Sequence, residues 1–154
     1  MRIALAADHA GYLLKNELKS KLSEQGHQVT DLGTNSAAST DYPDSAEAVA
    51  TAILGGQAER GIIVCGSGAG VSIAANKFPG IRAAVCHDTY TAHQAVEHDD
   101  MNVLCLGARV IGGALAIDLA CTFLAAKYAG EERFQRRLDK VLAIERRFTG
   151  GAIK

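Results

Sequence analysis

The fold of this chain is decided by one stretch, Gly61-Ile-Ile-Val-Cys-Gly-Ser-Gly-Ala-Gly-Val-Ser-Ile-Ala-Ala-Asn-Lys77. It opens with an apolar, β-branched run, Ile62 to Cys65, which is typical of a buried strand. Three glycines follow at positions 66, 68 and 70, and residues 71–77 are suited to a helix. A strand, a glycine turn and a helix in this order present backbone N–H groups and a positive helix end to an anion. Because Cys65 and Ser67 lie beside the turn, we expect the chemistry of the protein here.

Two other interpretations of this stretch stay open. A dinucleotide fingerprint has the spacing G-x-G-x-x-G after the first strand, whereas this chain has G-x-G-x-G after a middle strand, with Asp88 as the candidate ribose-binding acid. The stretch can also be a tight turn beside a small buried cysteine, a common fate of free cysteine. A Walker A loop does not fit, because no Lys-Ser/Thr pair follows the last glycine.

Composition narrows the class of protein. The chain has 154 residues, enough for a core of its own, so we expect a single domain over residues 1–154. Its net charge of −1 leaves no basic excess for binding nucleic acid. We expect neither a membrane partner nor a signal peptide, because no apolar run reaches the length of a span and Met1 leads directly into a strand-like segment.

The four cysteines, at positions 65, 86, 105 and 121, form no CxxC pair. This pattern is typical of a reducing cytoplasm rather than of a disulfide framework or a zinc site. We therefore expect a cytoplasmic protein in which Cys86, Cys105 and Cys121 are core residues and only Cys65 is active.

Strand-like and helix-like segments alternate along the whole chain. Strands are expected at 2–7, 27–32, 62–65, 82–86 and 103–106, and helices at about 12–25, 44–54, 71–77, 88–98, 114–128 and 131–148. Asp44 and Glu47 have the spacing of a capping box, which predicts that the second helix begins at Asp44. The alternation predicts a parallel sheet with helices on both faces, and such sheets bind ligands at the carboxyl ends of their strands.

Polar side chains gather where the predicted strands end: Asp8 and His9, then Cys65, then His87 and Asp88, then Arg109. Asp8 is also a good cap for the following helix, although an Asp–His pair is more than capping requires. His98 precedes the last strand and so belongs to the opposite end of the sheet, where a surface turn is the simpler interpretation.

A basic cluster of Arg133, Arg136, Arg137 and Lys140 lies on the last predicted helix. Arg133 and Arg137 are four residues apart and share a face, which suits a phosphate clamp, while a solvated helix face is the alternative. An apolar stripe runs beside the arginines and suits a subunit interface; its residues are Phe134, Leu138, Val141, Leu142 and Phe148.

With these motifs in their order, the sequence resembles the ribose-5-phosphate isomerase B and galactose-6-phosphate isomerase family. The resemblance covers nearly the whole chain and rests on residues 7–12 (ADHAGY), 41–44 (DYPD), 65–70 (CGSGAG), 73–77 (IAANK), 80–83 (GIRA), 102–107 (NVLCLG) and 133–137 (RFQRR). It implies a Rossmann-like three-layer αβα sandwich with a five-stranded parallel sheet and an extra C-terminal helix. It also implies aldose–ketose isomerisation of a small-molecule sugar phosphate without metal or cofactor. A homodimer or homotetramer is implied as well, with active sites shared between subunits and the helix at about 131–148 packing on a partner.

Residue by residue, the resemblance implies that Cys65 is the base that moves the proton between C1 and C2. Val71 stands where another branch of the family has glutamate and no cysteine, so the chain resembles the cysteine branch. Ser67 and His98 match the positions that open the sugar ring, with His98 donating the proton. The remaining matches are substrate contacts at Asp8 and His9, enediolate binding by the loop of Gly66, Ser67, Gly68, Ala69 and Gly70, and phosphate binding by Arg109, Arg133 and Arg137.

The chain departs from the family pattern at two positions. Asp99 stands where many members have Asn, and Phe134 stands where a histidine is frequent. We expect the Asp99 carboxylate to turn away from the developing negative charge, which it would otherwise disfavour. The expected reaction interconverts D-ribose 5-phosphate and D-ribulose 5-phosphate. Isomerisation of a hexose 6-phosphate such as allose or galactose 6-phosphate is the alternative, and a non-catalytic nucleotide- or sugar-phosphate-binding module is a further one.

Overall fold

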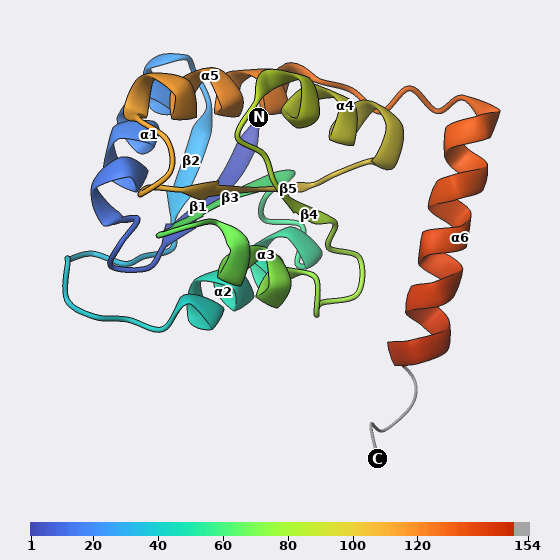
Figure 1. The fold of residues 1–154 in the computed structure, drawn as a ribbon, viewed down its shortest axis with the longest axis horizontal. Coiled ribbons are helices and arrows are strands. Elements are labelled where there is room, and N and C mark those ends of the chain that lie inside the picture. Colours follow the sequence, from blue (N-terminus) through green and yellow to red (C-terminus); the bar gives the residue numbers. More distant parts are fainter. Residues whose placement is uncertain (150–154) are drawn as a thin grey trace.

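A parallel five-stranded sheet forms the centre of the molecule (Figure 1). The computed structural model describes residues 1–149. The strand order is β2-β1-β3-β5-β4, and every neighbouring pair is parallel. The strands are β1 (Arg2–Ala7), β2 (Gln28–Asp31), β3 (Arg60–Cys65), β4 (Ala83–Val85) and β5 (Val103–Gly107). The three inner strands, β1, β3 and β5, are buried over almost their whole length, whereas the edge strands β2 and β4 are not.

Helices cover both faces of the sheet, so the predicted three-layer αβα sandwich is confirmed (Figure 1). On one face lie α1 (Tyr12–Glu24), α4 (Thr89–Asp99) and α5 (Gly113–Ala125). On the other lie α2 (Tyr42–Leu54) and the short α3 (Ala69–Ala75).

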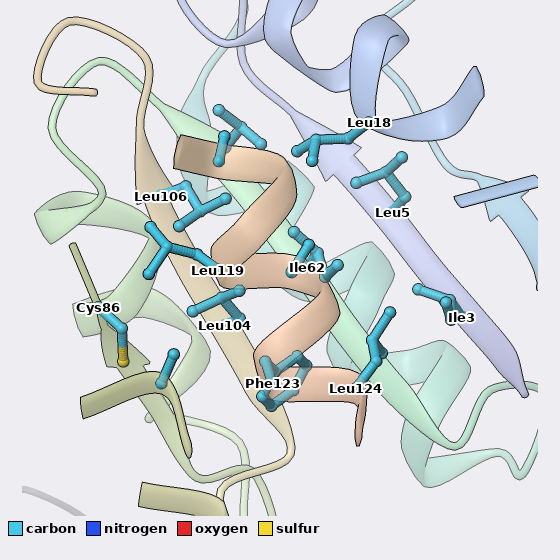
Figure 2. Packing of buried hydrophobic residues seen from close by; sticks show 14 of the residues in the cluster. Ile3, Leu5, Leu18, Ile62, Cys86, Leu104, Leu106, Leu119, Phe123 and Leu124 are labelled. Carbon is cyan, nitrogen blue, oxygen red and sulfur yellow. The ribbon is translucent and has the colours of Figure 1, made fainter. Parts of the chain in front are cut away.

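Two apolar layers, one on each face of the sheet, form the core. Side chains of the larger layer interdigitate between the strands and α5, as Figure 2 shows for Ile62, Leu104, Leu119 and Phe123. Each such side chain contributes about 1.5–3 kcal/mol when it is fully buried. Since successive strand residues point to opposite faces, Ile62 and Val64 enter this layer, whereas Ile63 and Cys65 enter the layer beneath α2 and α3.

The predicted capping box at Asp44 is wrong. Helix α2 begins at Tyr42, its N-cap residue is Asp41 in an extended conformation (φ −85°, ψ 125°), and Asp44 already lies in the first turn. Pro43 explains the earlier start, because proline lacks only an N–H that the first turn leaves unpaired and its fixed φ suits a helix.

The carboxyl ends of β1 and β3 lie side by side at the point where the strand order reverses. Strand β1 has β2 on one side and β3 on the other, with Ala7 opposite Val64. The Asp8 N–H then donates to the Val64 carbonyl at 3.1 Å. In a sheet of this kind the crevice outside such a switch point is the usual ligand site.

The last helix, α6 (Glu132–Thr149), stands beside the sandwich rather than on it (Figure 1). It touches the body through Phe134, which stacks on His98, and through Glu145, whose carboxylate accepts the Gly80 N–H at 3.0 Å. A groove of about 840 Å³ separates helix and body. The predicted apolar stripe is buried only at Phe134 and Leu138; Val141 and Phe148 are 53% and 68% exposed. None of the helices in residues 1–149 is long and apolar enough to span a membrane.

One ion pair is buried between α1 and β2. Lys15 is fully buried, and its ammonium donates to Asp31 Oδ1 at 2.5 Å. Asp31 also accepts from Lys19 and from the Gly33 N–H, both at 3.1 Å. Burial alone would raise the pKa of Asp31, but the hydrogen bonds from Lys15, Gly33 and Lys19 outweigh it and hold this pKa below its ordinary value.

We predict that Asp31→Asn destabilises the protein by about 3 kcal/mol at neutral pH, because it leaves the Lys15 charge buried without a counter-charge. Lys15→Met should cost less, since Asp31 keeps Lys19 and the Gly33 N–H. Urea unfolding measures both. The stabilising effect of Asp31 is present above its unfolded-state pKa and is lost as the pH falls through its lowered folded-state pKa, so wild type and Asp31→Asn should converge in acid.

A matched control is Lys21→Met, which removes a lysine from an exposed pair with Glu24 on the same helix and should leave the unfolding midpoint unchanged. An equal loss of stability from all three substitutions would contradict a special role for the buried Lys15–Asp31 pair.

Candidate active site

The thiol of Cys65 lies at the end of β3 and faces the glycine loop, residues 66–70. Cys65 is 5% exposed, and its Sγ accepts the Gly68 N–H at 3.1 Å. Gly68 is the N-cap of α3 and has a φ of +83°, a left-handed conformation that a side chain rarely adopts. The strand, turn and helix predicted from the sequence are therefore confirmed, and the turn directs a backbone donor at the sulfur.

The loop is packed directly against the turn that follows β5. A Cβ on Gly107 would lie 2.7 Å from the carbonyl carbon and oxygen of Ser67. The Ala108 N–H donates to the Cys65 carbonyl at 2.8 Å, and the Arg109 N–H donates to the Gly66 carbonyl at 3.0 Å. These bonds place the Arg109 side chain over Gly66. A Cβ on Gly66 would stand 3.6 Å from Cδ and 3.7 Å from Nε of Arg109. Arg109 thus joins Cys65 and the loop, as predicted.

Backbone donors of the loop remain available for a ligand. Within residues 1–149 the N–H groups of Ser67 and Gly70 have no acceptor, while the Ala69 N–H points to Ser67 Oγ at 3.3 Å. Two unpaired N–H groups beside a cationic side chain suit an anion or a developing oxyanion.

Asp8 and His9 lie at the end of β1, next to this loop. Asp8 Oδ1 accepts the N–H groups of Ala10 and Gly11 at 2.9 and 3.1 Å, so one carboxylate oxygen shapes the turn into α1. His9 Nδ1 lies 3.3 Å from both the backbone N and O of Thr40, which orients the ring toward the loop before α2. Asp8 therefore has a structural role whatever else it binds.

The other polar residues at this edge serve the fold. His87 Nε2 accepts the Gly107 N–H at 3.1 Å. Asp88 caps α4 by accepting the N–H and the hydroxyl of Thr91, both at 2.7 Å, and these bonds lower its pKa. The dinucleotide interpretation needs a free carboxylate at position 88, whereas both carboxylate oxygens of Asp88 already accept hydrogen bonds from Thr91.

Two of the other cysteines, Cys86 and Cys105, are unsuited to act as bases. Burial raises the pKa of Cys86 to about 11 and raises that of the deeply buried Cys105 further. Cys121 was predicted to be a core residue, but it is only half-buried, and its Sγ lies 3.3 Å from Gln25 Oε1. All four thiols are free.

A second group of predicted site residues lies near the amino ends of the strands, opposite the carboxyl ends that hold Cys65. Helix α4 starts just after the carboxyl end of β4 and ends at Asp99, shortly before β5 begins. Its 11 residues cover about 16 Å, so His98 is carried away from the edge that holds Cys65. The expectation that His98 enters from the opposite end is confirmed.

His98 is gathered there with the arginines of α6. Its ring stacks on Phe134 at a centroid distance of 4.0 Å and an angle of 17°. The guanidinium of Arg133 lies 4.4 Å from the centre of the same Phe134 ring. Arg137 and Asp99 line the groove between α6 and the body. One chain thus holds two separate groups of predicted site residues, the half-sites around Cys65 and around His98.

Sequence reasoning missed two side chains that touch these half-sites. The Tyr42 ring lies 3.1 Å from where a Cβ on Gly70 would stand, so it covers the loop. Gln94 reaches Nδ1 of His98 at 2.8 Å. The spacing of four residues between Gln94 and His98 was the available signal for the second contact. Residues 1–149 contain no group of three or more His, Cys, Asp or Glu side chains placed to hold a metal ion.

A thiol at a switch point, a glycine loop with unpaired N–H groups and separate arginine and histidine groups define a parallel α/β enzyme that handles a small anionic substrate. The family described as Ribose/Galactose Isomerase matches residues 3–141 of the chain. The protein belongs to this family.

Individual relatives agree over nearly the full length. Ribose-5-phosphate isomerase B of Escherichia coli is 47% identical over 146 residues, which are 95% of this chain and 97% of the relative. The structure of Clostridium thermocellum ribose-5-phosphate isomerase B superposes with a TM-score of 0.94 at 47% identity, covering 96% of this chain and 99% of that one. The Mycoplasma genitalium ribose-5-phosphate isomerase B with bound ribulose-5-phosphate has a TM-score of 0.88 at 39% identity, with coverage of 94% and 96%.

We predict that Gly107→Ala destabilises the protein by about 3 kcal/mol, because the new methyl group would meet backbone rather than a side chain that can move. The matched control is Gly112→Ala, five residues later in the same connection, where a Cβ meets nothing within 4 Å and φ is −85°. Urea unfolding compares the two variants. Similar stability of both would contradict the backbone contact between the loop and the β5 turn.

Proposed function

We propose that this protein interconverts D-ribose 5-phosphate and D-ribulose 5-phosphate as an aldose–ketose isomerase. The observation that carries the proposal is the thiol of Cys65 held against a loop whose Ser67 and Gly70 N–H groups are unpaired. Membership of the family supports the reaction type, and the relative that holds ribulose-5-phosphate supports the substrate.

The residues around Cys65 fit the enolisation. In the open-chain aldose the base must remove the C2 hydrogen and return it to C1, while negative charge develops on oxygen. We propose Cys65 as this base and the N–H groups of residues 66–70 as the oxyanion donors. One such preorganised donor contributes roughly 3–4 kcal/mol to the stability of the transition state. We propose that Asp8 and His9, at the neighbouring strand end, contact the substrate.

The residues around His98 fit the other two tasks. Ring opening needs a proton on the ring oxygen as the bond to C1 breaks, and loss of the C1 hydroxyl proton to a base. We propose that His98 donates the first proton, with Ser67 assisting at the opposite half-site. Arg109, Arg133 and Arg137 are the proposed phosphate ligands. Asp99, which is exposed and lines the same groove as Arg137, is proposed to face away from the enediolate.

We infer that each active site is completed by two copies of the chain. The separation of the half-sites across the sheet supports this, because the Cys65 half of one copy then meets the His98 half of another. The apolar residues of α6 support it too, since Val141, Ile144 and Phe148 are exposed along the groove within residues 1–149. We propose a single isomerase domain that forms a homodimer or a tetramer of such dimers in the cytoplasm, where free cysteines persist.

Cys65→Ala should lower the rate of isomerisation by at least about 10²–10⁴-fold, the typical contribution of a positioned acid or base. Binding of D-ribose 5-phosphate, measured by calorimetry, should change little because the arginines remain. Cys121→Ser, at a half-buried thiol outside both half-sites, is the matched control and should keep full activity. A Cys65→Ala enzyme within several-fold of wild type would show that the base lies elsewhere.

Mixed dimers test the shared site. Cys65→Ala and Arg137→Ala, each inactive alone, should regain activity when their subunits are exchanged, because each hybrid dimer then has one intact site and one doubly damaged site. A mixture of Cys65→Ala with Cys65→Ser, two lesions in the same half-site, should stay inactive. Inactive hybrids, verified by mass spectrometry and made from folded parents, would rule out sharing.

A further inference from the structure

Two side chains hold the imidazole of His98 from different directions. Gln94 precedes His98 by one helical turn on α4, and its amide lies 2.8 Å from Nδ1. Phe134 comes from α6 and lies flat on the ring, at 4.0 Å and 17°. Phe134 is only 2% exposed, so its own plane is fixed by packing. One contact thus fixes a ring nitrogen and the other fixes the ring plane.

The second ring nitrogen is left free. The nearest acid, Glu97, has Oε2 at 3.7 Å from His98 Nε2, too far for a hydrogen bond, and the same oxygen lies 3.4 Å from His93 Nε2. Within residues 1–149 Nε2 therefore has no acceptor, and the side chain keeps 30% of its surface exposed. The other charged groups around the ring are Asp99, next in the chain, and Arg133, against Phe134.

A glutamine at Nδ1 can serve as donor or as acceptor, because its amide has one end of each kind. With its nitrogen toward Nδ1, as placed here, it donates to a neutral imidazole that carries its proton on Nε2. With the amide turned over, its carbonyl oxygen accepts from the Nδ1–H of an imidazolium. The contact can thus persist in both protonation states.

We propose that Gln94 is a positioning residue for His98 that holds Nδ1 through both states of proton transfer, with Phe134 fixing the ring plane. The proposal rests on the proposed function, in which imidazolium Nε2–H protonates the sugar ring oxygen as the C1–O bond breaks. The C1 hydroxyl proton leaves to a base, and an aldehyde results. His98 is then neutral with its remaining proton on Nδ1, where the Gln94 carbonyl oxygen accepts it.

Three variants separate the possible roles of position 94. Gln94→Met keeps the length and removes both hydrogen-bonding ends. Gln94→Glu keeps only an acceptor and should hold Nδ1–H. Gln57→Met is the matched control, since Gln57 is exposed in the connection between α2 and β3. Gln94→Met should lower the isomerisation rate of D-ribose 5-phosphate about tenfold, part of the 10²–10⁴ attributable to a general acid.

Gln94→Glu should restore most of the rate lost in Gln94→Met and shift the alkaline limb of the pH profile upward, because a carboxylate favours the imidazolium. A rate for Gln94→Met equal to wild type would overturn the proposal. So would a Gln94→Glu enzyme as slow as Gln94→Met, since the acceptor end would then have no use.

A readout independent of turnover is the ¹⁵N spectrum of His98, identified by its loss in His98→Asn. At alkaline pH the wild type should carry the proton on Nε2 and Gln94→Glu should carry it on Nδ1, whereas Gln94→Met should show a mixture. Identical spectra in all three would overturn the proposal even in an inactive enzyme.

Enolisation can be followed without ring opening by deuterium washout from C1 of D-ribulose 5-phosphate. This ketose cannot form a five-membered ring, because its C5 oxygen is esterified. Gln94→Met should retain washout while net isomerisation falls, and Cys65→Ala should lose both. Loss of washout in Gln94→Met would overturn a role confined to His98. Unchanged isomerisation in His98→Asn would instead overturn the proposed acid, which keeps the two failures distinct.

Discussion

The backbone of the glycine loop lies directly on the backbone of the turn after β5, and no side chain fits between them. A Cβ on Gly107 would stand 2.7 Å from the Ser67 carbonyl, which is too close for any side chain, and a Cβ on Gly68 would stand only 3.1 Å from the Leu106 carbonyl carbon. Two N–H···O bonds, from Ala108 and Arg109, close the contact. Everything in the Cys65 half-site depends on it: the N–H aimed at the sulfur, the unpaired donors of the loop and the position of the Arg109 side chain. A fixed set of dipoles of this kind needs no reorganisation when charge develops, which is what oxyanion stabilisation requires.

The parallel sheet imposes the second constraint. Every strand delivers its following loop to one edge, so Asp8, Cys65 and Arg109 meet there from β1, β3 and β5. Helix α4 runs back across the sheet, so whatever it carries in its last turn belongs to the other edge. Under the proposed mechanism a proton donor on that turn therefore serves the Cys65 of another copy. Helix α6 agrees with this proposal, because it holds Arg133 beside the Phe134 ring that stacks on His98 and leaves Val141 and Phe148 exposed.

Much of this architecture could be predicted from local sequence. The β-branched run 62–65 followed by three glycines indicated the central strand and loop, and the alternation of elements indicated a parallel sandwich. The strand order β2-β1-β3-β5-β4 could not be predicted, because a connection that passes over one strand has the same local sequence pattern as a connection that passes over two.

The start of α2 was misplaced because the Asp44–Glu47 spacing imitates a cap, whereas Pro43 favours an earlier start. The Tyr42 contact with Gly70 joins residues distant in sequence, and no periodicity reveals it. Phe134 was expected in an apolar stripe, but its stacking on His98 depends on how α6 leaves the body.

The departures from the family pattern are not scattered over the site. Asp99 follows His98 in the chain, and Phe134 stacks on its ring, whereas Cys65 and the whole of residues 65–70 keep the pattern of the cysteine branch. A buried phenylalanine adds no titratable group beside His98, unlike the histidine frequent at that position, and it leaves Gln94 and Glu97 as the polar side chains near the two ring nitrogens. Under the proposed mechanism Phe134 bears on opening the sugar ring, because it stacks on the proposed acid, whereas Asp99 is proposed to face away from the enediolate. The loop of the proposed base Cys65 therefore keeps the family's residues, and what this sequence alters is the surroundings of the proposed acid His98.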